Sequence, residues 1–332
     1  MTLTDKHGRV HDYLRISLTD KCNLRCVYCM PAEGMHFMEN DKHLSFDEIE
    51  EVVRVAAKLG ITRLRLTGGE PLVRPHVEDL VARLHAIPGI EDIALTTNAI
   101  FLAPKAELLK KAGITRLNIS LDSMNPEKFA EITRGGHVHK VLEGLEAAFR
   151  VGFHPIKINT VLMKGFNDEE VDDFLRLSIE RDVHVRFIEY MPIGHDGDEW
   201  RDRYLSLDYV LERCQALGLT PEPTQSVYGN GPAEYYRLPN ARGTFGLIHP
   251  VSDHFCERCN RLRLTADGSL KPCLFWQDEF NVRPFIGDEQ ALIHLFHRSL
   301  DVKPESHEMA NVLFEENLTH AATLRRMSQI GG

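Results

Sequence analysis

The stretch Cys22-Asn-Leu-Arg-Cys26-Val-Tyr-Cys29 decides how the rest of the chain is interpreted. Its three cysteines have the spacing Cys-x3-Cys-x2-Cys, follow an apolar strand-like run and have no fourth cysteine nearby. Three thiolates can hold three irons of a [4Fe–4S] cube and leave the fourth iron open to a ligand that is not protein. The alternatives are a zinc site, which usually takes four nitrogen or sulfur ligands, and a redox-active cysteine pair.

Length and charge bound the class of protein. The 332 residues are enough for one large α/β domain and an appendage. A formal net charge of −10 argues against broad binding of nucleic acid or an anionic membrane, but it permits one local basic pocket. No apolar run is long enough to cross a membrane and the polar N-terminus lacks a signal-peptide core, so we expect a cytoplasmic protein. Its seven cysteines are then not expected to form structural disulfides.

Strand and helix patterns alternate along the first two thirds of the chain. Periodicity predicts strands at residues 13–18, 63–67, 92–97, 116–121, 156–161 and 184–190. It predicts helices between them at residues 45–59, 76–87, 104–112, 126–132, 140–151 and 168–181, the first opened by the capping box Ser45-Phe-Asp-Glu48. Six such units indicate a parallel sheet that curls toward a barrel, two units short of the eight that close one.

The pattern changes after Met191. We expect a helix at 207–217, short strands at 234–238 and 244–248, a hairpin at 261–271 and a helix at 290–300. A soft boundary near residue 220 divides the chain into residues 1–220, the partial barrel, and residues 221–332, a smaller C-terminal domain. Cys214, which stands alone, is expected to be a small core residue.

A second triplet, Cys256, Cys259 and Cys273, lies in this C-terminal part. It again offers three thiolates without a nearby fourth. Spacing alone does not distinguish an iron–sulfur cluster from a zinc site completed by His249 or His254, because soft thiolates suit both kinds of site.

The first triplet, Tyr28 within it and Gly68-Gly69-Glu70-Pro71 after the second strand together resemble the radical S-adenosylmethionine (radical SAM) superfamily. Glycines at that strand end let backbone approach a ligand closely, and parallel α/β proteins bind ligands at the carboxyl ends of their strands. In that superfamily the open iron binds the amino and carboxylate groups of SAM. The resemblance implies an open, TIM-like (β/α)6 partial barrel with a smaller C-terminal iron–sulfur domain.

A closer resemblance, to the GTP 3′,8-cyclase family of molybdenum-cofactor biosynthesis, runs from about residue 10 to the last residue. It is carried by both triplets, Arg261-Leu-Arg263, the terminus Gln329-Ile-Gly331-Gly332, Asn118-Ile-Ser-Leu-Asp and Arg186-Phe-Ile-Glu-Tyr-Met. It implies a lyase that converts GTP to (8S)-3′,8-cyclo-7,8-dihydroguanosine 5′-triphosphate through a 5′-deoxyadenosyl radical. It also implies two [4Fe–4S] clusters, SAM as cosubstrate, a flavodoxin or ferredoxin as electron donor, the downstream cyclic pyranopterin monophosphate synthase and a homodimer.

The same resemblance implies roles for individual residues. The expected ligands are Cys22, Cys26 and Cys29 for the first cluster, and Cys256, Cys259 and Cys273 for the second, whose open iron binds the guanine. Expected SAM contacts are Tyr28, Gly69, Ser120 and Met191, and expected GTP contacts are Arg15, Arg65, Thr96, Lys157, Arg261 and Arg263. The expected catalytic group is Arg15, Arg261, Arg263, Gly331 and Gly332. Inward cations on barrel strands are costly unless paired, and a triphosphate is a suitable partner.

The C-terminal glycines and the Asn98-Ala99 loop are two further features of the sequence. The sequence alone predicts that Gly331-Gly332 is a frayed end, whereas the family implies that it threads into the active site. Asn98-Ala99 stands where the family more usually has Asn-Gly, and because alanine disfavours positive φ we expect that loop to differ slightly.

Two alternative functions stay open beside the cyclase. They are a peptide-modifying radical SAM enzyme with an auxiliary cluster, and a zinc-stabilised binding module without catalysis.

Overall fold

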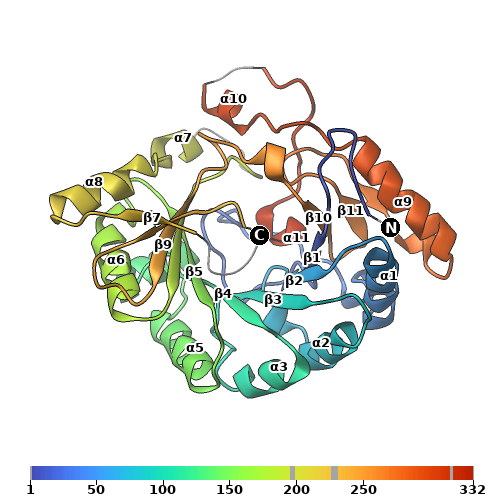
Figure 1. Cartoon of the computed structure of the whole chain (residues 1–332), viewed down its shortest axis with the longest axis horizontal. Coiled ribbons are helices and arrows are strands. Elements are labelled where there is room, and N and C mark those ends of the chain that lie inside the picture. The colour runs from blue at the N-terminus through green and yellow to red at the C-terminus, as the bar shows by residue number, and fades with distance from the viewer. Residues whose placement is uncertain (1, 195–198, 226–230, 315–316, 332) are drawn as a thin grey trace.

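The structure, a computed structural model, describes residues 2–194, 199–225, 231–314 and 317–331. Its strands form one sheet in the order β12-β11-β10-β1-β2-β3-β4-β5-β6-β9-β8-β7. Figure 1 shows this sheet curving around the middle of the molecule, with α1, α2, α3, α5 and α6 on the outside and α11 inside. The two ends of the sheet do not pair with each other, so the predicted open α/β barrel is confirmed.

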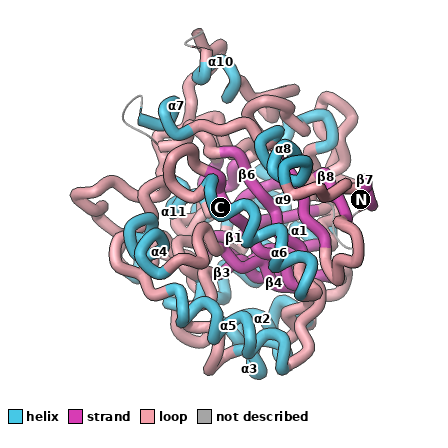
Figure 2. The backbone as a smooth tube through the Cα atoms, turned by 90° about the vertical axis from the view of Figure 1, so that its left-hand side faces the viewer, coloured by secondary structure: helices cyan, strands magenta, loops and turns pink. Residues whose placement is uncertain are grey.

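The six predicted strand–helix units are all present. The strands are β1 (Tyr13–Ser17), β2 (Arg63–Thr67), β3 (Asp92–Thr97), β4 (Arg116–Ser120), β5 (Ile156–Leu162) and β6 (His184–Glu189). The helices are α1 (Phe46–Lys58), α2 (Val77–His85), α3 (Ala106–Ala112), α4 (Pro126–Thr133), α5 (Val138–Arg150) and α6 (Val171–Glu180). Figure 2 shows the strands gathered inside and α2, α3 and α5 outside them.

Side-chain alternation on parallel strands separates the core from the interior of the barrel. Leu14 and Ile16 of β1 are fully buried in the hydrophobic core, which also includes the apolar face of α1. Arg15 points to the opposite face and stands in register with Arg65 of β2. The capping box predicted for α1 is present, because Ser45 Oγ accepts the Glu48 N–H and the Glu48 carboxylate accepts the Ser45 N–H.

The C-terminal part of the chain adds strands to both edges of the six-stranded sheet. The strands are β7 (Glu222–Thr224), β8 (Glu234–Arg237), β9 (Thr244–Ile248), β10 (Arg261–Leu264), β11 (Ser269–Lys271) and β12 (Phe280–Asn281). β9 pairs with β6 and β10 with β1, both in parallel, and β10 and β11 form the predicted hairpin. The sheet therefore runs across the boundary expected near residue 220, and the division into two domains stays a prediction.

Five helices accompany these strands in the described residues. They are α7 (Glu199–Arg203), α8 (Asp208–Ala216), α9 (Glu289–Asp301), α10 (Met309–Leu313) and α11 (Met327–Ile330). Cys214 on α8 is fully buried, as expected for a core residue. Across the described ranges, no helix is both long and apolar enough to cross a membrane.

Backbone contacts hold the cysteine loop against the loop after β2. The Gly69 N–H donates to Thr19 O at 2.6 Å and the Glu70 N–H donates to Lys21 O at 2.8 Å. A Cβ at Gly69 would lie 2.3 Å from Lys21 O, so this approach needs a residue without a side chain. The Glu70 carboxylate also accepts the Thr97 hydroxyl at 2.7 Å, which ties in the end of β3. From the sequence we expected Gly68 and Gly69 to let the backbone approach a ligand closely. The structure shows that Gly69 also lets the two loops pack against each other.

We predict that Gly69→Ala lowers the free energy of unfolding by about 1–3 kcal/mol, because backbone must move to accept the methyl group. Urea unfolding measures this loss. The iron content after anaerobic reconstitution should also fall, because the cysteine loop is displaced. Ser45→Ala is the matched control: losing the helix cap costs about 1 kcal/mol but lies outside the cysteine loop, so iron should be retained. Wild-type stability in Gly69→Ala would contradict the packing role.

Candidate active site

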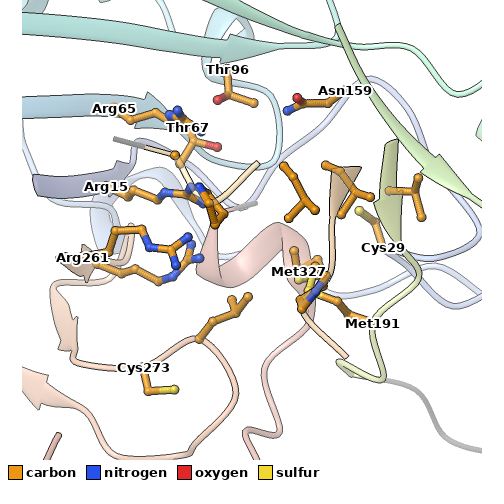
Figure 3. A pocket seen from close by; sticks show the side chains of 18 of the residues that line it. Arg15, Cys29, Arg65, Thr67, Thr96, Asn159, Met191, Arg261, Cys273 and Met327 are labelled. Carbon is orange, nitrogen blue, oxygen red and sulfur yellow. The ribbon is translucent and has the colours of Figure 1, made fainter. Parts of the chain in front are cut away.

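Both cysteine triplets line one cavity inside the curved sheet. The first lies on the loop after β1, and the second lies on segments that flank the β10–β11 hairpin. Other predicted residues that line the same cavity are Arg15, Tyr28, Arg65, Gly69, Thr96, Ser120, Met191, Arg261 and Arg263. Figure 3 shows Cys29 and Met191 on one side of this cavity and Arg261 and Cys273 on another.

The thiols of the first triplet lie in surroundings that disfavour free thiolates. Burial raises the pKa of Cys22 to about 12 and, together with the neighbouring thiols and Asp122, raises the pKa of Cys26 and Cys29 further. The Leu24 N–H lies 3.4 Å from Cys22 Sγ and can donate to it. Three half-buried soft donors fit an iron–sulfur cluster, whose iron supplies positive charge that stabilises their thiolates.

The second triplet has a more positive environment. Burial raises the pKa of Cys256 to about 11, but for Cys259 the nearby Lys303 and Arg261 outweigh burial and lower the pKa to about 6. A buried thiolate stabilised by cations suits a metal centre. This donor set therefore also fits a cluster.

The histidines considered for a zinc site lie elsewhere. His249 lies 3.7 Å from the Glu189 carboxylate, and the His254 ring packs 5.6 Å from the His307 ring. Neither His249 nor His254 lines the cavity. Among the residues that the structure describes, no three His, Cys, Asp or Glu side chains are gathered around a single metal ion.

Arginines from three neighbouring strands face the cavity side by side. In register, Arg15 on β1 stands between Arg65 on β2 and Arg263 on β10. Burial, followed by neighbouring charges, lowers the pKa of Arg65 and Arg263 to about 10 and that of Arg15 well below its usual value. Within the described ranges none of the three forms a salt bridge, and the Nε atoms of Arg15 and Arg65 have no hydrogen-bond partner. Such a group of cations requires an anionic ligand.

Lys157 lies outside the cavity wall. It is 4% exposed, and its Nζ lies 5.6 Å from the centre of the Tyr235 ring. Burial and then Arg186 lower its pKa to about 6. Asn159, two residues further along β5, lines the cavity instead. Of the expected GTP contacts, Lys157 is therefore the one that does not line the cavity.

Sequence reasoning missed several residues of the wall. Arg186 on β6 donates to Asn118 Oδ1 at 2.6 Å and leaves its Nε without a partner in the described region. The buried oxygens Thr96 Oγ1 and Asn159 Oδ1 are also unpartnered there. Alternation along β5 and β6 would have identified Arg186 and Asn159 as inward-facing residues.

The wall beside the first triplet is fixed by a carboxylate that was also missed. The Tyr28 hydroxyl donates to Asp122 Oδ2 at 2.6 Å, and the Val161 N–H donates to Asp122 Oδ1 at 2.9 Å. Burial raises the pKa of Asp122 to about 6. Asp122 ends the motif that begins at Asn118, so the sequence did contain a signal for it.

Ala99 adopts the conformation that glycine would favour. Its φ is 61°, its N–H donates to Thr97 Oγ1 at 2.9 Å, and its side chain is fully buried. Gly144 on α5 leaves room for it, because a Cβ there would lie 2.3 Å from Ala99 O. Ala99 thus occupies the left-handed region despite its side chain; whether the loop differs from that of the family stays a prediction.

The C-terminal tail enters the barrel. Gly331 is buried, has φ 84° and accepts a hydrogen bond from Arg263 Nη1 through its carbonyl oxygen at 2.5 Å. A Cβ on Gly331 would lie 2.6 Å from Thr67 Cγ2 and 3.2 Å from Ser17 Cβ, so the tail reaches the carboxyl ends of β1 and β2. Gly331 is therefore not a frayed end. Gly332 lies outside the described residues.

Arg325 anchors this tail from the other side. Its guanidinium donates to both carboxylate oxygens of Glu279 at 2.7 Å and to Asp267 at 2.8 Å. Asp267 lies at the turn of the β10–β11 hairpin, whose first strand carries Arg261 and Arg263. Met327 and Ser328, just beyond Arg325, line the cavity. The hairpin and the tail are therefore positioned together.

The comparison with known proteins agrees with this geometry. Residues 16–178 match the Radical SAM superfamily and residues 183–309 match Molybdenum Cofactor Synthesis C. Streptococcus suis SuiB bound to S-adenosylmethionine has a TM-score of 0.60 at 16% identity, over 93% of this chain and 69% of that one, which supports the fold alone. Fold and cysteine loop together define a radical SAM protein.

Curated relatives identify the family within that class. GTP 3′,8-cyclase of Listeria monocytogenes EGD-e is 56% identical over 330 residues, 99% of each chain, and that of Limosilactobacillus fermentum is 51% identical over the same shares. The chain belongs to the GTP 3′,8-cyclase family. Full-length identity at this level sets it apart from a zinc-stabilised module and from peptide-modifying enzymes.

We predict that Arg325→Gln loosens the tail, because the two carboxylates lose their shared cation. Carboxypeptidase should then remove the C-terminal residues roughly tenfold faster, the equivalent of about 1.4 kcal/mol. Arg176→Gln is the matched control, since Arg176 pairs with Asp173 on the exposed surface of α6. Equal digestion rates for both variants would contradict the anchoring role.

Proposed function

We propose that this protein catalyses the conversion of GTP to (8S)-3′,8-cyclo-7,8-dihydroguanosine 5′-triphosphate, the first step of molybdenum-cofactor biosynthesis. The cofactors are S-adenosylmethionine and two [4Fe–4S] clusters. The observation that carries the proposal is the row of inward-facing arginines, which have no carboxylate partner among the residues that the structure describes, in a cavity that both cysteine triplets line. Such a cavity suits a substrate that is anionic at one end.

The first triplet would hold the cluster that works with S-adenosylmethionine. When bound, these two groups supply the radical that removes a hydrogen from the ribose of the substrate. Tyr28, Gly69, Ser120 and Met191 would contact S-adenosylmethionine, since all four line the cavity that this triplet lines. The bond from Tyr28 to Asp122 fixes the tyrosine ring, which helps to present one substrate hydrogen and no other.

The second triplet and the arginines would hold the two ends of GTP. Cys256, Cys259 and Cys273 would hold the second cluster next to the guanine. The guanidinium groups of Arg15, Arg65, Arg261 and Arg263, with Thr96, would bind the triphosphate and ribose, because planar guanidinium forks match phosphate oxygens. Lys157, which lies outside the cavity wall, would add positive charge near the site.

The tail would complete the catalytic group. Through its bond to Arg263, Gly331 holds one arginine of the cavity in place, and the side chain of Ile330 is buried beside it. A tail in this position excludes water from a reaction that proceeds through reactive species.

We also propose the partners that this reaction needs. A flavodoxin or ferredoxin would supply single electrons, and cyclic pyranopterin monophosphate synthase would consume the product. Six reduced cysteines at metal sites favour a cytoplasmic location. A homodimer rests on the family resemblance.

Anaerobic incubation of the reconstituted protein with S-adenosylmethionine, GTP and dithionite tests the proposal. We predict 5′-deoxyadenosine together with a cyclised GTP product, both measured by liquid chromatography and mass spectrometry. Cys26→Ala should abolish both products, because it removes a ligand of the first cluster. Cys214→Ala is the control, since this buried cysteine lies outside the cavity, and it should keep full turnover. Formation of 5′-deoxyadenosine without a GTP product would refute GTP as the substrate.

A further inference from the structure

Lys303 is a buried cation beside the second cysteine triplet. The reaction proposed for this protein gives Lys303 no role. It lies just after α9, is 2% exposed and lines the cavity together with Cys259 and Cys273. Its Nζ donates to Arg261 O at 2.9 Å and to Pro272 O at 2.5 Å. Pro272 directly precedes Cys273, and Arg261 follows Cys259 by two residues. The ammonium group therefore ties together the backbone on both sides of the hairpin that separates these two cysteines.

Lys303 has no carboxylate to balance its charge within the described part of the chain, unlike two other buried cations nearby. Arg9 donates to Cys256 O at 2.9 Å, but its charge is balanced by Asp5 at 2.6 Å. Lys271 is fully buried, and its Nζ lies 3.5 Å from Glu279. A buried charge without a counter-ion is costly, so an anion is expected beside Lys303.

The sulfur atoms of the second triplet are the anionic groups that answer this need. Lys303 lines the cavity together with Cys259 and Cys273, and both of its hydrogen bonds go to carbonyl oxygens within two residues of these cysteines. A cluster bound by these thiolates would place net negative charge beside the ammonium group.

We propose that Lys303 is the charge partner of the iron–sulfur cluster held by Cys256, Cys259 and Cys273, and that it raises the reduction potential of that cluster. Three thiolates outweigh the positive charge of a [4Fe–4S] core, so the cluster is anionic and each added electron makes it more so. A fixed cation in a buried site stabilises the more negative state. Lys303 is thus a positioning residue that also sets how readily the second cluster accepts an electron. The proposal relies on the proposed function only for the kind of cluster.

The test is a redox titration followed by electron paramagnetic resonance, with iron content measured in parallel. The full-length chain with Cys22, Cys26 and Cys29 replaced by Ala is the parent, so that only the second cluster contributes a signal. Lys303→Gln keeps amide donors for the two carbonyls but removes the charge, and it should shift the midpoint potential to more negative values. Lys303→Arg keeps the charge and should hold the potential close to the parent value.

Lys271→Gln is the matched control. It removes a second buried lysine, but Glu279 remains paired with Arg325, so the potential should move less than in Lys303→Gln. If Lys303→Gln keeps its iron and has the same midpoint potential as the parent, then Lys303 only holds the backbone in place and the proposal is wrong. If Lys303→Gln loses the cluster, retention by Lys303→Arg supports the charge requirement, and loss in both variants contradicts it.

No substrate enters this titration, so its outcome is separate from the proposed function. If the potential shifts here but the wild-type chain forms no cyclised GTP in the turnover assay, the cyclase is refuted and the Lys303 proposal stands. If the wild-type chain turns over GTP but the potential does not shift in Lys303→Gln, the Lys303 proposal is refuted and the cyclase stands.

Discussion

The parallel pairing of β10 with β1 is the contact on which the whole site depends. It joins a strand from the C-terminal third of the chain to the first strand of the barrel and places Arg263 beside Arg15, which stands beside Arg65. The same pairing brings the second triplet to the cavity that the first triplet lines. The two cysteine loops therefore flank a single site instead of lying apart.

This arrangement has an electrostatic cost. Three guanidinium groups lie in register, burial lowers the pKa of each, and Arg65 and Arg263 lower the pKa of Arg15 further. The protein supplies only partial relief, such as the Gly331 carbonyl that accepts from Arg263. An anionic substrate removes the remaining cost, so substrate binding and relief of repulsion are the same event. A phosphate group can bind to such a site without first displacing a protein carboxylate from the arginines.

Much of the fold could be predicted because its signals are local. Apolar alternation, the capping box at Ser45 and the regular spacing of helices and strands are properties of short stretches, and the structure confirms them. The partner of β10 could not be predicted, since periodicity identifies a strand but not the strand that it pairs with. The close approach of Gly69 to Lys21 was hidden for the same reason, because it depends on two loops that meet only in the folded chain.

The site was predictable where a motif carries it and missed where packing alone does. The cysteines and the arginines of Arg261-Leu-Arg263 are recognisable in the sequence, whereas Gly331 was expected inside the barrel only from the family resemblance, and Lys303 lies in no motif. Lys157 was expected among the GTP contacts, but strand alternation gives only the face on which a residue lies and not whether its side chain reaches the cavity.

The binding of GTP compared with guanosine tests the central claim most directly. Both ligands carry the same base and ribose, so any difference in their affinity for the anaerobically reconstituted protein reports on the triphosphate. Equilibrium dialysis at low ionic strength should show GTP bound at least a hundredfold more tightly, about 2.7 kcal/mol, with most of that advantage lost when Arg65 is replaced by Met. Equal affinities for GTP and guanosine would contradict the account, because the buried arginines would then have some other partner.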